Sequence, residues 1–173
     1  MTQVTKWFER KFEFSFPLEL YPNLIVRLQG TPARLEEIVR GCPGEVLVRR
    51  PQPDKWSAQE HAGHLLSLEP LWMARVNDYA TESSELTVAD LSNRGTFEAD
   101  YNARPLVEIL GGFREARRRL VERTADFQPA MFARTMLHPR LKQPMRLVDH
   151  LYFVAEHDDH HLARIWEMIK AGA

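Results

Sequence analysis

Hydrophobic positions recur at helical spacing through most of the chain. Between residues 24 and 41, apolar side chains return every three or four residues and so share one face of an amphipathic helix; they include Leu24, Leu28, Leu35 and Ile38. Pro32 lies within this run and has no amide hydrogen, so the helix should kink or restart there. Because the periodicity continues beyond Pro32, the pattern predicts one kinked helix that ends near Gly41.

A capping box marks the start of a second helix. Ser57 and Glu60 are spaced so that each side chain can bind the free backbone amide of the other residue. The helix is predicted to continue through HAGHLLSLEPLWMARVNDYA, with a bend at Pro70. Residues 81–104 show no sustained period and predict a long crossover. Loops of that length are uncommon unless they serve a function.

Two further helices are predicted in the C-terminal half. Apolar residues at helical spacing define one from Leu106 to Leu120, although Gly111 and Gly112 weaken its middle. The other runs from about residue 147 to residue 170. The segment between them, FARTMLHPRLKQP, is too irregular to assign. Four main helices with one long crossover predict an all-α fold, a four-helix bundle.

Length and composition narrow the class of protein. The 173 residues fit a single domain, 1–173, whose residues 1–20 form an aromatic arm expected to pack across the bundle rather than to make a dimer contact. A net charge of -1 gives no general attraction to nucleic acid or to an anionic membrane. With one cysteine, no signal-peptide core and no long apolar run, we expect a cytoplasmic protein without a membrane segment.

Histidines concentrate on two of the predicted helices. His157 and His161 stand four residues apart on the last helix, so their imidazoles point the same way and can reach one metal ion. A third ligand must come from another element. His64 on the second helix is the natural donor if the two helices face each other, although spacing alone does not separate it from His61. His160 projects further outward and is expected at the surface.

Three other residues are candidates for the surroundings of this site. Asp158 falls near the middle of an apolar stripe, where it could orient an imidazole or act as a base, or pair with an arginine at the rim. Arg75, three turns beyond the histidine of the second helix, could bind an anionic substrate group or form a structural ion pair. His150 could line the pocket, or be half-buried and bonded to a carbonyl. The run 117–119, three arginines, predicts a mostly solvated face.

Three segments carry a family resemblance. KWSAQEHAGHLLSLEPLW, HPRLKQPMRLVDHLYFVAEHDDHHLARI and RLQGTPARLEEIVRG resemble motifs of the DinB-like family, the damage-inducible, metal-binding helical bundle proteins. The resemblance implies His64, in the pattern W-S-x-x-E-x-x-x-H, together with His157 and His161 as metal ligands, and it sets aside His61 and His160. It also implies an up-down-down-up bundle that is often dimeric and binds zinc or nickel.

The family resemblance also implies a reaction class. Characterised members are similar to thiol S-transferases that use bacillithiol or mycothiol, including a maleylpyruvate isomerase, and many others are described as metal-dependent hydrolases. Three neutral histidines leave an open coordination position, where a thiol or a water would lose its proton more easily. A hydrolase also needs a general base. Glu60 is expected to be held by the capping box, which leaves Asp158 as the one other carboxylate near the site.

The sequence therefore favours a thiol S-transferase that acts on a small molecule. A hydrolase is the alternative. A second alternative is a non-enzymatic metal-containing binding or stress-response module, in which His61 or His150 completes the coordination of the ion.

Overall fold

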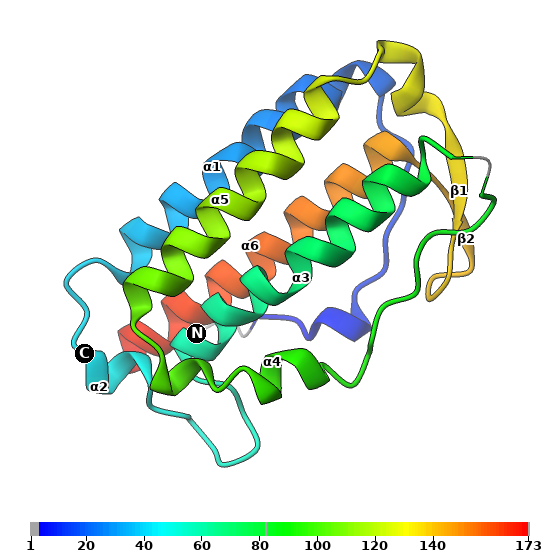
Figure 1. Ribbon diagram of the computed structural model, residues 1–173. Coiled ribbons are helices and arrows are strands. Elements are labelled where there is room, and N and C mark those ends of the chain that lie inside the picture. The colour runs from blue at the N-terminus through cyan, green and yellow to red at the C-terminus, as the bar shows by residue number, and fades with distance from the viewer. Residues whose placement is uncertain (1–3, 82, 173) are drawn as a thin grey trace.

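Four long helices lie side by side in the computed structural model, which describes residues 4–81 and 83–172 (Figure 1). They are α1 (Tyr21–Val39), α3 (Ala58–Asp78), α5 (Leu106–Ala125) and α6 (Leu147–Gly172). In Figure 1, α1 and α6 run in one direction and α3 and α5 in the other, so the chain order is up-down-down-up. This confirms the predicted fold. The predicted domain, 1–173, includes residues 1–3, 82 and 173, which lie outside the described part.

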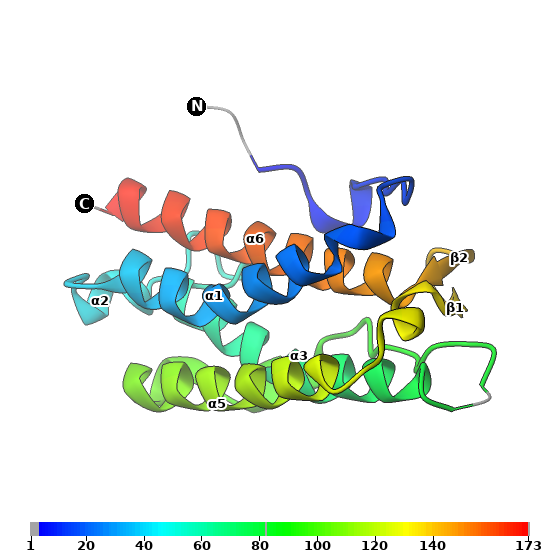
Figure 2. The same cartoon turned by 90° about the horizontal axis from the view of Figure 1, so that it is seen from above.

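Each long helix packs against two others. Both α1 and α3 contact α5 and α6, so α1 and α3 occupy opposite corners of the bundle. Viewed from above, α1 and α6 form one layer and α3 and α5 the other (Figure 2). The interface between α3 and α6 therefore brings together the two helices on which the sequence concentrates histidines.

The apolar periodicity of α1 and the capping box of α3 mark helices as predicted. In α1 Leu24, Leu28 and Leu35 of the predicted apolar stripe are buried, Ile38 is half-buried, and the helix continues through Pro32. At the start of α3, the Ser57 hydroxyl accepts a hydrogen bond from the Glu60 amide at 3.1 Å, and the Glu60 carboxylate accepts one from the Ser57 amide at 2.8 Å. Pro70 lies inside α3 without ending it.

The long crossover joins the parallel helices α3 and α5 and packs back onto α3. It contains the short helix α4 (Arg94–Glu98) and a 3-10 helix, η3 (Tyr101–Ala103). The Tyr101 ring lies so close to Gly63 of α3 that a side chain at that position would overlap with it. The Tyr101 hydroxyl is also hydrogen-bonded to Ser67 at 2.7 Å. These contacts fix the crossover beside His64.

The unassigned segment before α6 forms a β-hairpin. Strands β1 (Thr135–His138) and β2 (Gln143–Arg146) pair antiparallel, with Met136 opposite Met145 and both side chains buried. The crossover joins this sheet, because the Leu137 carbonyl accepts a hydrogen bond from the Leu86 amide at 3.0 Å. The remaining short elements are α2 (Gly44–Leu47), η1 (Trp7–Glu9), η2 (Leu18–Leu20) and η4 (Pro129–Ala133).

The N-terminal arm, described from residue 4, lies on the α1/α6 side of the bundle (Figure 2). Four of its aromatic residues pack against the hydrophobic core: Trp7, Phe12, Phe14 and Phe16. The Trp7 ring contacts both Phe153 and His157 of α6, with centroids 5.1 and 5.0 Å away. Phe8, by contrast, is 59% exposed. No helix in the described part of the chain is long and apolar enough to cross a lipid bilayer.

Candidate metal centre

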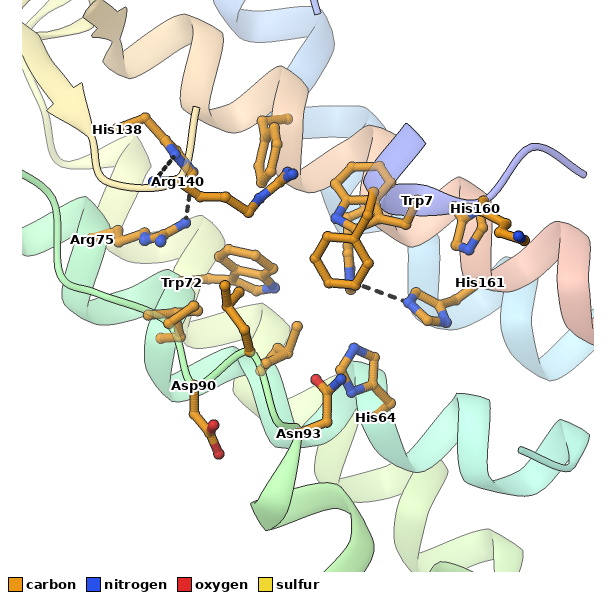
Figure 3. Close-up of a pocket in the computed structure, with 18 of the residues that line it drawn as sticks. Trp7, His64, Trp72, Arg75, Asp90, Asn93, His138, Arg140, His160 and His161 are labelled. Atoms are coloured by element: carbon orange, nitrogen blue, oxygen red, sulfur yellow. Dashed lines mark hydrogen bonds between the residues drawn. The ribbon is translucent and has the colours of Figure 1, made fainter. Parts of the chain in front are cut away.

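Three buried imidazoles meet between α3 and α6. His64 comes from α3 and His161 from α6 (Figure 3), and His157 lies one turn before His161 on the same helix. Each offers one ligand atom, and these atoms lie within 4.8 Å of one another. In the described residues, no fourth His, Cys, Asp or Glu belongs to this group. The structure thus brings together the three histidines that the family resemblance implies as ligands.

The other nitrogens of two of these rings have hydrogen-bond partners. His64 Nδ1 lies 2.9 Å from the Thr96 hydroxyl of α4, and His161 Nδ1 lies 2.7 Å from His61 Nδ1. Both rings can therefore direct Nε2 toward the common centre. Histidines that bind metal commonly hold their second nitrogen in this way. Spacing alone left His61 open as a ligand. In the structure it instead contacts Nδ1 of His161, the ring nitrogen that does not face the common centre.

Burial keeps these histidines uncharged. It lowers the pKa of His64 to about 3, with the neighbouring His160 as a smaller cause. Burial also lowers the pKa values of His157 and His161 well below 6.5. Neutral imidazole is the form that binds a metal ion. The Nε2 atoms of His157 and His161 lie 3.2 Å apart, and a cation between such lone pairs would satisfy both. The three residues therefore fit a divalent metal ion.

A cavity of about 580 Å³ opens onto the three histidines. Aromatic residues form much of its wall: Trp7, Trp56, Trp72 and Phe153. Trp72 is 3% exposed and belongs to the core cluster, yet it also lines the cavity. His160, predicted at the surface, is half-buried 5.9 Å from the Trp7 ring and lines the same cavity.

Asp158 lies away from the candidate ligands. Its carboxylate accepts a hydrogen bond from the Thr31 hydroxyl at 3.0 Å and pairs with both terminal nitrogens of Arg117. The side chain is completely buried and is not at the rim, although the predicted arginine partner is present. None of its hydrogen bonds in the described structure goes to a histidine. This placement gives no support to a role for Asp158 as a base or as an orienting group for a ligand.

The predicted solvated face of the three arginines on α5 is wrong for Arg117. Its side chain is 1% exposed and pairs with Glu69 of α3 at 2.6 Å as well as with Asp158 of α6. Arg118 and Arg119 are exposed and pair with Glu115 on the same helix. Three consecutive helical positions point in three directions, and here one of them faces the bundle interior.

His150 fits neither of its two sequence interpretations. It is completely buried beside the rings of Trp72 and Tyr79, at centroid distances of 5.9 and 6.1 Å, and it does not line the cavity. Neither of its ring nitrogens has a hydrogen-bond partner in the described structure. Burial lowers the pKa of His150 well below 6.5.

Arg75 lines the cavity at the end away from the metal centre (Figure 3). Its Nε donates to the Thr87 carbonyl at 2.9 Å, and its Nη1 lies 3.2 Å from His138 Nε2. Arg75 forms no ion pair within residues 4–81 and 83–172, so the structural ion pair that we considered is not found there. His138 and Arg140 of the hairpin also line this end, and sequence analysis missed both because the hairpin itself was not assigned.

Comparisons with known proteins agree with this architecture. The model of the DinB superfamily matches residues 27–165. No curated protein sequence matches the chain. Among solved structures, YfiT from Bacillus subtilis superposes with a TM-score of 0.81 at 21% identity, over 94% of this chain and 93% of that one. It is described as a probable metal-dependent hydrolase with an unusual four-helix bundle topology. Since the family model covers most of the sequence, the chain belongs to the DinB superfamily.

Proposed function

We propose that the protein binds one divalent metal ion through His64, His157 and His161 and uses it in a reaction on a small molecule. The observation that carries this proposal is the meeting of three buried, uncharged imidazoles beside an open cavity. Three protein ligands and an accessible fourth position are typical of catalytic zinc sites, whereas structural sites are closed by four. Zinc and nickel both suit imidazole ligands, and either ion is part of the proposal.

The proposed reaction is the transfer of a low-molecular-weight thiol. A divalent ion bound here would lower the pKa of a coordinated thiol or water toward neutral pH. Hydrolysis would also need a general base, and the nearby carboxylates have other partners. Glu60 is held by Arg50 and the capping box, and Asp158 by Arg117. His61 is too weak a base near pH 7, because burial lowers its pKa to about 3.

Hydrolysis is the second candidate, and the description of YfiT as a probable metal-dependent hydrolase favours it. Two carboxylates line the outer part of the cavity, Glu85 and Asp90. Asp90 accepts hydrogen bonds from Ser92 and Arg94 of its own loop, which occupies both of its oxygens. The absence of a free base next to the three histidines in the described structure therefore ranks transfer first. A cytoplasmic homodimer, as expected from sequence and resemblance, completes the proposal.

Metal content is the first test. Untagged protein, purified and supplied with zinc or nickel, should contain about one ion per chain by plasma mass spectrometry. His64→Ala and His157→Ala should contain almost none, because each leaves only two ligands. His160→Ala is the matched control: it removes a cavity histidine outside the three and should keep the ion. Wild-type protein that stays metal-free would overturn the proposal.

Activity separates the candidates. The zinc-loaded protein should accelerate the reaction of a small thiol with an electrophile such as 1-chloro-2,4-dinitrobenzene, and the metal-free His64→Ala variant should not. If the loaded protein instead hydrolyses p-nitrophenyl esters without any thiol, the hydrolase is correct. A loaded protein with neither activity would favour the non-enzymatic binding module.

A further inference from the structure

A second polar cluster lies in the same cavity, at the end away from the three histidines. It consists of Arg75 from α3, His138 from β1 and Arg140 from the hairpin turn (Figure 3). Trp72 lies between the two ends of the cavity in Figure 3. His64 and Arg75 are 11 residues apart on one helix, which separates their backbone positions by about 16 Å along the axis.

His138 faces Arg75 as a hydrogen-bond donor. Its Nδ1 accepts hydrogen bonds from the backbone amides of Arg140 and Leu141, at 3.2 and 3.1 Å. Burial lowers the pKa of His138 to about 3, so the ring is neutral and carries a single proton. Since the amides occupy the Nδ1 lone pair, this proton must be on Nε2. The contact of 3.2 Å between His138 Nε2 and Arg75 Nη1 therefore joins two donors, and an acceptor is missing.

Arg140 adds further donors without an acceptor. Its Nη2 is buried and has no hydrogen-bond partner in the described structure. The guanidinium lies over the rings of Phe8 and Phe153, 5.3 and 5.8 Å from their centroids. Like Arg75, it forms no ion pair within residues 4–81 and 83–172. Buried polar groups are rarely left unpaired, and buried charges are normally compensated.

We propose that Arg75, Arg140 and His138 bind a carboxylate of the substrate. The anion would accept hydrogen bonds from both guanidinium groups and from His138 Nε2, while the reacting end of the molecule reaches the three histidines. This inference rests on the proposed function, since it defines the substrate of the same cavity. The substrate class is an elongated monocarboxylic acid whose apolar middle lies along Trp72, between the two polar ends in Figure 3, and along Phe153, which also lines the cavity.

The cluster suits a singly charged, planar anion better than a phosphate dianion. Two guanidinium groups supply the positive charge, because burial keeps His138 neutral. The planar fork of arginine matches the two oxygens of a carboxylate.

The test is binding to metal-free protein, so that a carboxylate cannot bind through the ion. Isothermal titration calorimetry compares the affinities for 4-phenylbutyrate, its uncharged analogue 4-phenylbutanamide and inorganic phosphate. The comparison gives the contribution of the carboxylate to binding. We expect the carboxylate to bind at least tenfold more tightly than the amide and than phosphate, and its affinity to fall at least tenfold in Arg75→Gln and in Arg140→Gln. Arg75→Lys should recover only part of the affinity, because lysine lacks the fork.

Arg123→Gln is the matched control: Arg123 is half-buried, makes an exposed hydrogen bond to Asn77 and does not line the cavity, so the variant should bind like wild type. Circular dichroism identifies a variant that does not fold. If Arg75→Gln does not fold, Arg140→Gln tests the proposal instead, because Arg140 lies in a hairpin turn. Equal affinity for the carboxylate and the amide, or unchanged affinity in the folded Arg140→Gln variant, would overturn the inference. Preferential binding of phosphate would also overturn it. Metal content is measured separately, so the failure of one proposal can be distinguished from the failure of the other.

Discussion

Buried histidine nitrogens in this protein differ in what surrounds them. In the candidate metal centre, the rings of His64 and His161 each have a partner on Nδ1, and their remaining nitrogens face other imidazoles. His150 is equally buried but, among the residues that the structure describes, neither of its nitrogens has a partner, and it does not line the cavity. The arrangement of His64 and His161 is suited to binding an ion, whereas the burial of His150 without a partner only destabilises the fold.

Replacing His150 with leucine should therefore stabilise the fold. A buried polar group without a partner costs about 1–3 kcal/mol, and a leucine of similar volume removes that cost. We expect the free energy of unfolding of His150→Leu, measured by urea denaturation at pH 7.5, to be equal to or above that of wild type. Metal content should not change. A clear loss of stability would show that the imidazole makes a polar contact that the structure lacks.

Thr96 should tune the affinity of the metal centre without binding the ion. Its hydroxyl is the partner of His64 Nδ1, and removal of such partners typically lowers metal affinity by about 10- to 100-fold. Thr96→Val should show this loss in a zinc titration against a chelator. Thr124→Val is the control: Thr124 is also buried, but its hydroxyl donates to backbone carbonyls of its own helix and not to a histidine of the metal centre. Equal affinities in the two variants would contradict the role of Thr96.

At the scale of elements, a buried charge network connects the four long helices. Arg117 of α5 binds Glu69 of α3, Asp158 of α6 and the Leu28 carbonyl of α1. Asp158 also accepts from Thr31 of α1. The Arg117 charge keeps Asp158 compensated, while burial raises the pKa of Glu69 to about 6 despite the arginine. This network fixes α6 relative to α3, and so the two halves of the metal centre.

Loss of Arg117 should be severe. Arg117→Met leaves two buried carboxylates without compensation, and breaking a buried ion pair in this way typically costs about 3–5 kcal/mol. Chemical denaturation at pH 7.5 should show that loss. The neighbouring Arg118→Met removes exposed pairs to Glu115 and Glu122 and should leave the free energy of unfolding almost unchanged. Similar effects of the two substitutions would contradict the importance of the network.

The elements that sequence could predict are those fixed by local signals. Helical periodicity and the capping box of Ser57 and Glu60 depend on residues close in the chain, so α1, α3, α5 and α6 were all predicted. The hairpin was not, because its strands have four residues each and their pairing with each other and with the crossover is tertiary. The interior position of Arg117 was missed for the same reason: its partners lie on two other helices.

At the scale of the whole molecule, the candidate site combines segments from most of the chain. Spacing predicted the pair His157 and His161, and the family resemblance selected His64 from the second helix. The partner of His64 comes from the crossover, the wall includes the N-terminal arm, and the donor cluster includes the hairpin. No periodicity shows that these segments converge, so Thr96 and Arg140 could be found only from the structure.

The number of buried neutral histidines also predicts how the molecule responds to acid. His61 and His64 have pKa values of about 3 in the fold, and those of His150, His157 and His161 are well below 6.5. In the unfolded chain each should titrate near 6.5. Below pH 6.5 the unfolded state therefore binds protons that the folded state does not, so stability is complete above pH 6.5 and falls as the pH decreases toward 3. Glu69 has the opposite effect on stability: because its pKa is raised to about 6 in the fold, the folded state binds the extra proton between about pH 6 and 4.5. This single carboxyl group offsets only part of the effect of the histidines.

Urea denaturation of metal-free protein at pH 7.5, 6.5 and 5.5 measures this effect. Each histidine contributes up to about 1.4 kcal/mol per pH unit once the pH is below 6.5, so the free energy of unfolding should fall by several kcal/mol between pH 6.5 and 5.5. His150→Leu removes one of these groups and should give a shallower decrease. Equal stability at pH 7.5 and 5.5 would mean that these histidines accept protons in the folded state. That result would also remove the argument that three uncharged imidazoles are held ready for a metal ion.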